Sequence, residues 1–298
     1  MSYLQYRKLK NILFLGSLYM SALIALLPLF LILQYLILKG ATSLNLDFFL
    51  HDPSPVGEAG GGMRHAIVGT LYMVGIGSLI SVPIGLLCGI YLAEFGRGKT
   101  AKILRFTIDM LTGIPSIIIG IFAYILIVAP LQSFSALAGG FALSIIILPI
   151  VTRSTEEILK LVPTHIREAG LALGLPRWRV IFQIIVKGNF KSLITGIMLA
   201  VSRAAGETAP LLFTAFGNMY LNFQISEPMA SLPVQIYTYA ISPFDQWQEQ
   251  AWAAAFVLIT IVLGINLVSR ALVNNKMIIG QSKRVINHTR LIRKKKGN

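Results

Sequence analysis

The sequence predicts an all-α integral membrane protein with six transmembrane helices, and three features indicate this fold class. Of the 298 residues, 55% are hydrophobic and only 13% are charged, whereas a soluble domain carries about 25% charged residues. The apolar residues form long runs without charge, and about 20 such residues let a helix cross the hydrocarbon core. The lysine and arginine residues lie between these runs, and their number alternates from loop to loop.

The apolar runs define the predicted spans in order along the chain. The third and fourth spans share one charge-free stretch of 43 residues, in which Pro130 and the small polar residues after it favour a turn. The fifth span is interrupted by Arg203 and Glu207. The six predicted spans are 11–38, 66–93, two within 110–152, 190–216 and 250–269.

The basic residues predict the orientation of the chain. Of the 26 lysine and arginine residues, 23 lie in the N-terminal tail, the second and fourth loops, and the C-terminal tail. Cytoplasmic loops carry the excess of basic residues, so both termini are predicted to lie in the cytoplasm. The net charge of +14 then reflects contact with anionic membrane lipid and not with nucleic acid.

This topology divides the chain into three predicted parts. Residues 1–65 comprise the N-terminal tail, the first transmembrane helix and the first extracytoplasmic loop. Residues 66–273 form a five-helix core that includes the cytoplasmic loop 153–191, and residues 274–298 form a basic cytoplasmic tail. The first apolar run is longer than a signal-peptide core of about 7–15 residues, which predicts an uncleaved first helix.

The sequence carries no recognisable motif for catalysis or metal binding. Gly98-Lys99-Thr100 is similar to the end of a phosphate-binding loop, but Ala93 stands where that motif requires its first glycine. The four histidines are scattered along the chain and lack the spacing of zinc ligands. We therefore predict no enzyme activity, no catalytic residue, no metal and no cofactor bound by this chain.

The charges within the fifth span are the most informative. Arg203 lies midway along it, and an arginine at the centre of a membrane helix costs about 2.5–3.5 kcal/mol. Glu207 follows one helical turn later and can pair with it. Both belong to a predicted stripe of small and polar residues on one helix face: Gly196, Ala200, Arg203, Glu207, Pro210 and Thr214.

This stripe leaves two interpretations open. In the first, Arg203 and Glu207 form a structural ion pair that holds helices together. In the second, they line a pathway for a polar solute. Arg203 would then favour an anion, and Glu207 would favour a solute that donates a proton.

The fourth loop predicts a surface for a partner protein. Residues 154–161 and 166–172 favour short helices, which end before Pro163 and Gly174, and an amphipathic stretch follows at 178–185. A bent helix pair of this kind is typical of a surface presented to another protein. An interfacial helix resting on lipid is the alternative.

The same loop resembles the EAA loop of ABC importer permeases. The matching residues are Glu168-Ala169-Gly170, Gly174 and Ile184. Gly170 replaces the third alanine of that loop, and Val186-Lys187 replaces its usual Leu-Pro. The octapeptide from Arg203 to Pro210 resembles the signature of the phosphate-specific importer permeases, and it is more similar to the PstA type than to the sister PstC type. Two further segments are similar to the same family: 61–94 and 113–117.

The resemblance implies a MetI-like ABC importer permease bundle in a bacterial inner membrane. It also implies the partners: a homologous permease subunit, two copies of a cytoplasmic ATP-binding subunit that holds ATP and Mg, and an extracytoplasmic phosphate-binding protein. Arg203 and Glu207 would border the phosphate path. The helix that couples to the ATPase would carry four of the matching residues: Glu168, Ala169, Gly170 and Gly174.

Other functions stay open at this point. The closest are an importer of another oxyanion and the sister PstC-type subunit. A stand-alone ion-coupled carrier or channel would be expected to show an internal repeat and more ionisable residues in its spans. The glycines 60–62 either lead flexibly into the second helix or offer amides to an anion. Loop 217–249, which lacks basic residues, either receives the binding protein or folds over its own helices.

Overall fold

The structure is a computed structural model that describes residues 3–41, 44–55, 60–267 and 271. Within these residues it consists of helices and loops without a strand, which agrees with the predicted all-α class. The helices are α1 (Tyr3–Gly40), α2 (Leu46–Leu50), α3 (Arg64–Glu94), α4 (Lys99–Gly113), α5 (Ser116–Ala123), η2 (Tyr124–Val128), α6 (Ala129–Leu131), α7 (Ala136–Lys160), α8 (Thr164–Ala172), α9 (Arg177–Arg179), η3 (Val180–Val186), α10 (Phe190–Ala205), α11 (Ala209–Leu212), α12 (Leu232–Ala240) and a last helix, Asp245–Leu267, called the C-terminal helix below.

The number of candidate membrane spans agrees with the six that the sequence predicts. Helices α1, α3, α7 and the C-terminal helix are each long and apolar enough to cross a membrane alone. Two further spans are pairs of helices bent at a short break. The chain bends by 102° between α4 and the segment Ser116–Leu131. It bends by 72° between the segment Arg177–Val186 and α10.

The break between α4 and α5 arises at a proline. Pro115 has no N–H to donate, and its ring disfavours helical backbone at the residue before it. Ile114 accordingly adopts φ −73° and ψ 129°. The sequence placed the third span within 110–152, whereas the bent pair that forms the third candidate span begins earlier, at Lys99, and turns sharply at residue 114.

The fifth span also differs from its prediction. Helix α10 ends at Ala205, and Gly206 follows it with φ −96° and ψ 0°. A continued helix would place the ring of Pro210 against the carbonyl of Gly206. The prediction of one helix through residue 216 is therefore wrong. The fourth loop is also shorter than expected, because residues 153–160 continue α7.

Helices α3 and α7 pack together through a stripe of small residues. The buried members recur every four residues along α3: Gly77, Ser81, Gly85 and Gly89. A Cβ at Gly89 would lie 2.5 Å from the Cβ of Thr155 and 2.7 Å from the carbonyl oxygen of Thr152. Small residues let helix backbones approach closely within a membrane, so this stripe sets the spacing of the two helices.

The stripe predicts the effect of a larger residue. We expect Gly89→Val to lower the free energy of unfolding by about 1–3 kcal/mol, because an overpacked interface forces the helices apart. The midpoint of thermal unfolding in detergent measures the change. Gly75→Val is the matched control, since nothing lies within 4 Å of a Cβ placed on Gly75 of the same helix. Equal losses in both variants would assign the effect to valine itself and not to the interface.

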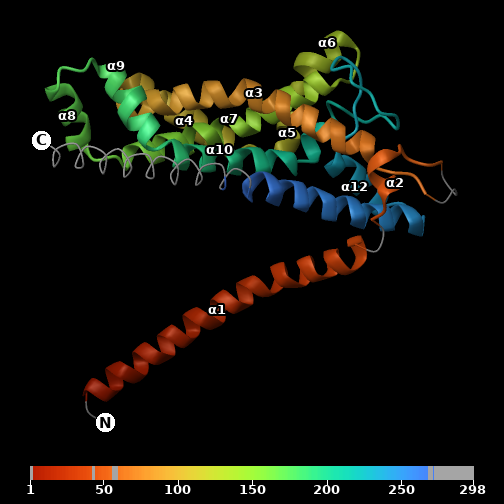
Figure 1. Cartoon of the computed structure of the whole chain (residues 1–298), viewed down its shortest axis with the longest axis horizontal. Coiled ribbons are helices and arrows are strands. Elements are labelled where there is room, and N and C mark those ends of the chain that lie inside the picture. Colours follow the sequence, from red (N-terminus) through yellow and green to blue (C-terminus); the bar gives the residue numbers. More distant parts are fainter. Residues whose placement is uncertain (1–2, 42–43, 56–59, 268–270, 272–298) are drawn as a thin grey trace, which may run out of the picture.

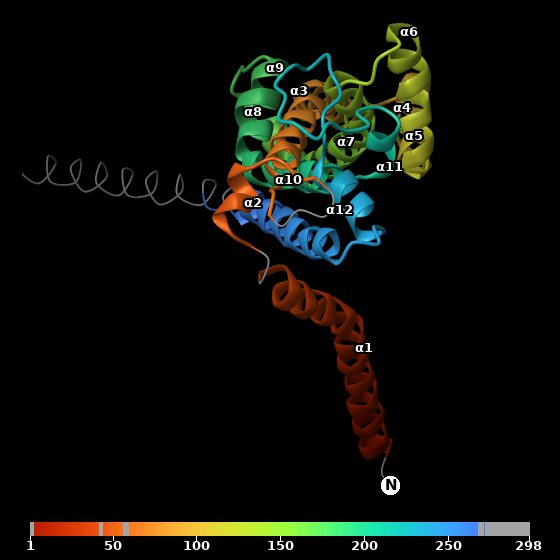
Figure 2. The ribbon, with the colours of Figure 1, turned by 90° about the vertical axis from the view of Figure 1, so that its right-hand side faces the viewer.

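The helices place different elements at the two ends of the bundle. Figure 1 shows α8 and α9 at one end, called the α8 end below, and α2, α6 and α12 at the opposite end, called the α2 end. Helix α1 stands away from the bundle over most of its length (Figure 2). It touches the C-terminal helix where the rings of Tyr35 and Trp252 meet edge to face at 5.0 Å. Most of its apolar side chains are exposed, and Leu36, near its C-terminal end, is buried; the exposed part suits a helix surrounded by lipid.

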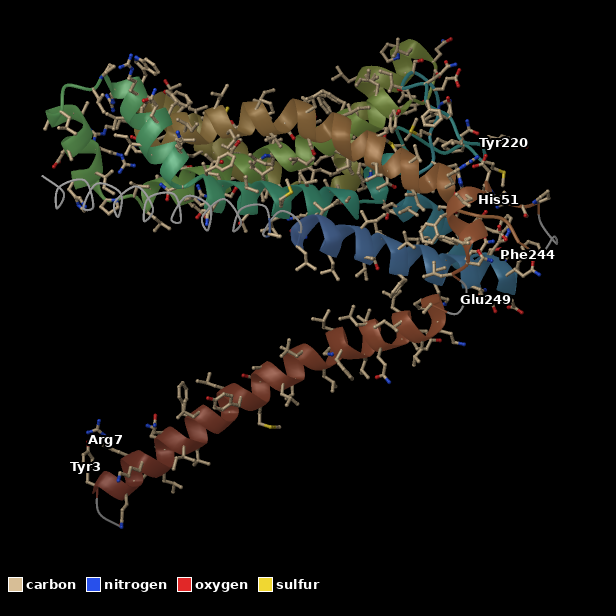
Figure 3. All side chains as sticks on the ribbon, in the orientation of Figure 1. Tyr3, Arg7, His51, Tyr220, Phe244 and Glu249 are labelled. Atoms are coloured by element: carbon tan, nitrogen blue, oxygen red, sulfur yellow. The ribbon has the colours of Figure 1, made fainter. Side chains whose placement is uncertain are left out.

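The α2 end contains the start of α3 and the glycines 60–62 before it. The sequence left two roles open for these glycines: a flexible lead-in to the helix or an anion site. Figure 3 shows His51 and Tyr220 at this end. Three N–H groups there donate to carbonyl oxygens of the α2 region, in the pairs Gly62–Asp52, Met63–Phe48 and Arg64–His51. These amides are therefore already paired within the chain. Of the three glycines at 60–62, the geometry favours a structural role for Gly62.

Candidate functional site

A cavity of about 160 Å³ lies where α10 ends, beside the break between α4 and α5. Its wall includes both predicted pathway residues, Arg203 and Glu207. The other lining residues come from α4, the break, α5 and α7: Leu111, Thr112, Ile114, Pro115, Ser116, Ile119, Ile146, Pro149 and Ile150. The fold thus brings the segment 113–117 and the octapeptide from Arg203 to one place, although about 90 residues separate them in the chain.

The end of α10 positions the two charged side chains. The N–H groups of Gly206 and Glu207 bond to the carbonyl oxygens of Arg203 and Ala204 at 3.1 and 3.2 Å, which tightens the last turn into a 3₁₀-like form. Arg203 lies in this last turn, where the partial negative charge of a helix C-terminus favours a cation. Glu207 lies just beyond the helix, so the two side chains do not share a continuous helix face.

Arg203 and Glu207 are near one another but only loosely paired. The distance from Nε of Arg203 to Oε1 of Glu207 is 3.9 Å, and the side chains are 60% and 18% exposed. A structural ion pair within a membrane would be expected to be short and hydrogen-bonded. This separation leaves guanidinium donors that can turn toward a solute, with a carboxylate acceptor beside them.

The cavity offers an anion further polar groups. Helix α5 begins at Ser116, and the N-terminus of a helix carries partial positive charge. Thr112 also lines the wall, from α4, but its hydroxyl donates its one proton to the carbonyl oxygen of Ile108 at 2.9 Å and has none left for an anion. Sequence reasoning missed Thr112, which lies just before the segment 113–117 that the sequence singled out, whereas Ser116 lies within that segment.

The predicted stripe on α10 divides into two surfaces. Gly196 and Ala200 pack inside the protein: a Cβ on Gly196 would lie 2.8 Å from Oγ of Ser154, and Ala200 is fully buried. Thr214 is also buried, and its hydroxyl donates to the carbonyl oxygen of Pro210 at 2.8 Å. The first half of the stripe is therefore a helix-packing surface, and only Arg203 and Glu207 reach the cavity.

The octapeptide also packs directly on α5. A Cβ on Gly120 would lie 2.7 Å from Cα of Pro210 and 3.2 Å from its carbonyl oxygen. Glycine is therefore needed at position 120 for α5 and α11 to approach this closely. This contact fixes the position of the segment after Glu207 relative to the wall of the cavity.

The predicted coupling residues lie on or just after α8, at the α8 end. Glu168 and Ala169 are exposed, whereas Gly170 is buried. A Cβ on Gly170 would lie 2.9 Å from Cγ2 of Val180. This contact explains why glycine replaces the usual alanine, since the bulky side chain of Val180 occupies the space.

Gly174 ends α8 with a positive φ of 77°. Its N–H donates to the carbonyl oxygen of Leu171 at 2.9 Å, and the N–H of Leu175 donates to that of Gly170 at 3.3 Å. This pair of bonds is the Schellman motif, in which a glycine adopts the left-handed conformation after a helix. Gly174 therefore reverses the chain and leaves the outer face of α8 free.

Comparisons with known proteins agree with this fold. Residues 81–275 match the family described as "Binding-protein-dependent transport system inner membrane component". The chain is similar in structure to the MetNI methionine ABC transporter, with a TM-score of 0.57 and 18% identity over 72% of this chain and 94% of that one. It is also similar to a bacterial alginate ABC transporter, with a TM-score of 0.54 and 15% identity over 89% of this chain and 95% of that one.

The fold, the α8 loop and these matches define a class, the multi-pass inner-membrane permeases of binding-protein-dependent ABC importers. The PstA phosphate transport system permease protein of Haemophilus influenzae is 46% identical over 91% of this chain and 96% of its own length. The PstA protein of Mycobacterium leprae is 38% identical over 89% of both chains. The chain belongs to the PstA family of permease subunits. It is a transport subunit and not an enzyme.

Proposed function

We propose that this chain forms, with a homologous partner permease, the pathway by which inorganic phosphate crosses the inner membrane. The observation that carries the proposal is the loosely paired Arg203 and Glu207 on the wall of one cavity, 3.9 Å apart. Membership of the PstA family supports phosphate as the solute, because the relatives named above are phosphate transport permeases.

The two side chains have complementary roles in this proposal. The guanidinium of Arg203 presents several N–H donors to the oxygens of a tetrahedral oxyanion. The carboxylate of Glu207 accepts a hydrogen bond from the acidic O–H that phosphate retains near neutral pH. Sulfate lacks such a proton and would meet the carboxylate as a like charge. The pair thus favours phosphate over a fully ionised oxyanion.

Energy for transport comes from other subunits in this proposal. Two copies of a cytoplasmic ATP-binding subunit hold ATP and Mg, and one of them docks on α8 of this chain through the surface around Glu168. This chain binds neither ATP nor metal. The α8 end faces the cytoplasm together with both termini, which the distribution of basic residues supports. The extracytoplasmic phosphate-binding protein docks at the α2 end, where loop 217–249 lies, and alternating access moves the solute between the ends.

Uptake of labelled phosphate tests the proposal. The full chain and its partner subunits are placed in cells that lack other high-affinity phosphate uptake. We expect ATP-dependent uptake that excess sulfate does not inhibit. Uptake of a different oxyanion in place of phosphate would refute phosphate as the solute, but it would leave the assignment as a permease subunit intact. Uptake without the ATP-binding subunit would favour a stand-alone carrier.

A further inference from the structure

Helix α8 is fastened to α3 by one buried ion pair, although 73 residues separate the two side chains in the sequence. Nε of Arg167 donates to both carboxylate oxygens of Glu94 at 3.0 Å, and Nη2 donates to Oε1 at 2.6 Å. The side chain of Glu94 is 5% exposed and that of Arg167 is 21% exposed. A buried, forked arginine–carboxylate contact fixes both position and orientation.

The remaining donors of Arg167 bind the end of α7. Nη1 donates to the carbonyl oxygen of Val162 at 2.5 Å, and Nη2 donates to that of Leu159 at 2.9 Å. Leu159 lies in the last turn of α7 and Val162 lies just beyond it, where carbonyl oxygens lack the i+4 partner of a continued helix. One guanidinium therefore joins three elements: α8, the end of α7 and the end of α3.

Glu94 is also held from the other side of the coupling loop. Its carbonyl oxygen accepts a hydrogen bond from Nη2 of Arg177 at 3.0 Å. The guanidinium of Arg177 also lies over the ring of the neighbouring Phe95, 4.5 Å from its centroid, which is a favourable cation–π geometry. The last residue of α3 thus contacts the helices before and after Gly174.

Helix α3 continues from this point to the opposite end of the protein. Its 31 residues correspond to about 45 Å at 1.5 Å per residue. At the α2 end, the hydroxyl of Thr70 accepts a hydrogen bond from the N–H of Leu232 at 2.8 Å. A Cβ on Gly69 would overlap the carbonyl oxygen of Ala230. A shift of α3 therefore moves the segment that leads into α12.

We propose that Glu94 and Arg167 are positioning residues that transmit the ATP-driven movement of α8 to α3, and through α3 to the extracytoplasmic end. This inference rests on the proposed docking of the ATP-binding subunit on α8. The apolar cluster beneath α8 holds it in place and includes Ile90 and Ala93 of α3, but most of its members come from neighbouring parts of the chain. The ion pair links the loop to a helix that spans the whole protein.

The test uses the full transporter in lipid vesicles, with phosphate uptake and ATP hydrolysis measured per assembled complex. We expect Glu94→Gln to retain the ATP-binding subunit and to lower the phosphate moved per ATP about tenfold, a typical size for the loss of coupling between sites. The phosphate-loaded binding protein should also stimulate hydrolysis about tenfold less. Arg167→Lys retains the charge but loses the forked hydrogen bonds to the carboxylate. Its ratio of phosphate moved to ATP hydrolysed should lie between those of the wild type and Glu94→Gln.

Glu157→Gln is the matched control, because Glu157 is a 65% exposed carboxylate on α7 near the same end. It should leave the ratio unchanged. A purely structural role of Glu94 would reduce the amount of complex and leave phosphate per ATP unchanged, which would overturn the proposal. If Glu94→Gln does not assemble, Glu94→Asp is measured instead, and failure of both variants to assemble would assign the pair to folding alone.

The wild-type protein separates this inference from the proposed function. Wild-type vesicles that move another anion would refute phosphate as the solute, and the ratio could still be measured with that anion. Wild-type protein that does not bind the ATP-binding subunit through α8 would refute the docking on which the inference rests.

Discussion

Replacement of Arg203 by glutamine is expected to abolish phosphate uptake while the transporter still assembles. The side chain lines the cavity with Glu207, and its guanidinium is the principal positive charge there. Loss of a hydrogen bond from a charged donor to the solute costs about 1.5–3 kcal/mol, so uptake should fall about tenfold or more. Arg203→Lys should retain part of the activity, since it keeps the charge without the planar donors. Uptake of labelled phosphate at matched membrane abundance measures the effect.

The double variant Arg203→Gln/Glu207→Gln separates a pathway from a structural ion pair. If the pair only holds helices together, the single variant leaves the partly buried Glu207 without its partner, and the second substitution should restore stability and uptake. If Arg203 meets the solute, the double variant stays inactive. Arg97→Gln is the control for loss of one charge, because Arg97 is exposed in the loop between α3 and α4. Recovery of uptake in the double variant would contradict the pathway role.

The sequence predicts the spans well because hydropathy and charge decide which helices enter a membrane. It does not predict where a span breaks. Pro115 ends α4, yet Pro28, Pro83 and Pro149 lie inside the unbroken helices α1, α3 and α7. A proline in an apolar run is therefore an ambiguous signal, and packing against neighbouring helices decides its effect.

The site could be predicted where its residues are close in sequence. Arg203 and Glu207 are four residues apart, and an arginine inside a span is conspicuous in any hydropathy profile. Their companions on the cavity wall, Thr112 and Ser116, are ordinary residues whose role depends on the break beside them. The contact between Glu94 and Arg167 joins positions 73 residues apart, and neither residue is unusual in its local sequence.

Reversal of the charge of Glu168 is expected to detach the ATP-binding subunit from the membrane complex. Glu168 lies exposed on α8, on a face that Gly174 leaves free by reversing the chain. A lysine there would meet the basic groups that bind the glutamate in the proposed interface, and such a like-charge contact costs several kcal/mol. We therefore expect Glu168→Lys to reduce copurification of the ATP-binding subunit at least about tenfold. Uptake should be lost with it, whereas the amount of this chain in the membrane should not change.

A control substitution on α7, and the alternative that α8 rests on lipid, each predict a different result from the loss of copurification expected for Glu168→Lys. Glu157→Lys places the same charge on α7 near the same end, where the carboxylate is 65% exposed and paired with Arg153, and it should retain the ATP-binding subunit. If α8 instead rests on lipid, a lysine at position 168 would strengthen contact with anionic headgroups, and copurification would not fall. The substitution should leave the fold intact, because Glu168 is exposed and α8 is held by the contact of Gly170 with Val180 and by the ion pair of Arg167 with Glu94. Loss of copurification in Glu168→Lys but not in Glu157→Lys would therefore place the ATP-binding subunit on this face of α8.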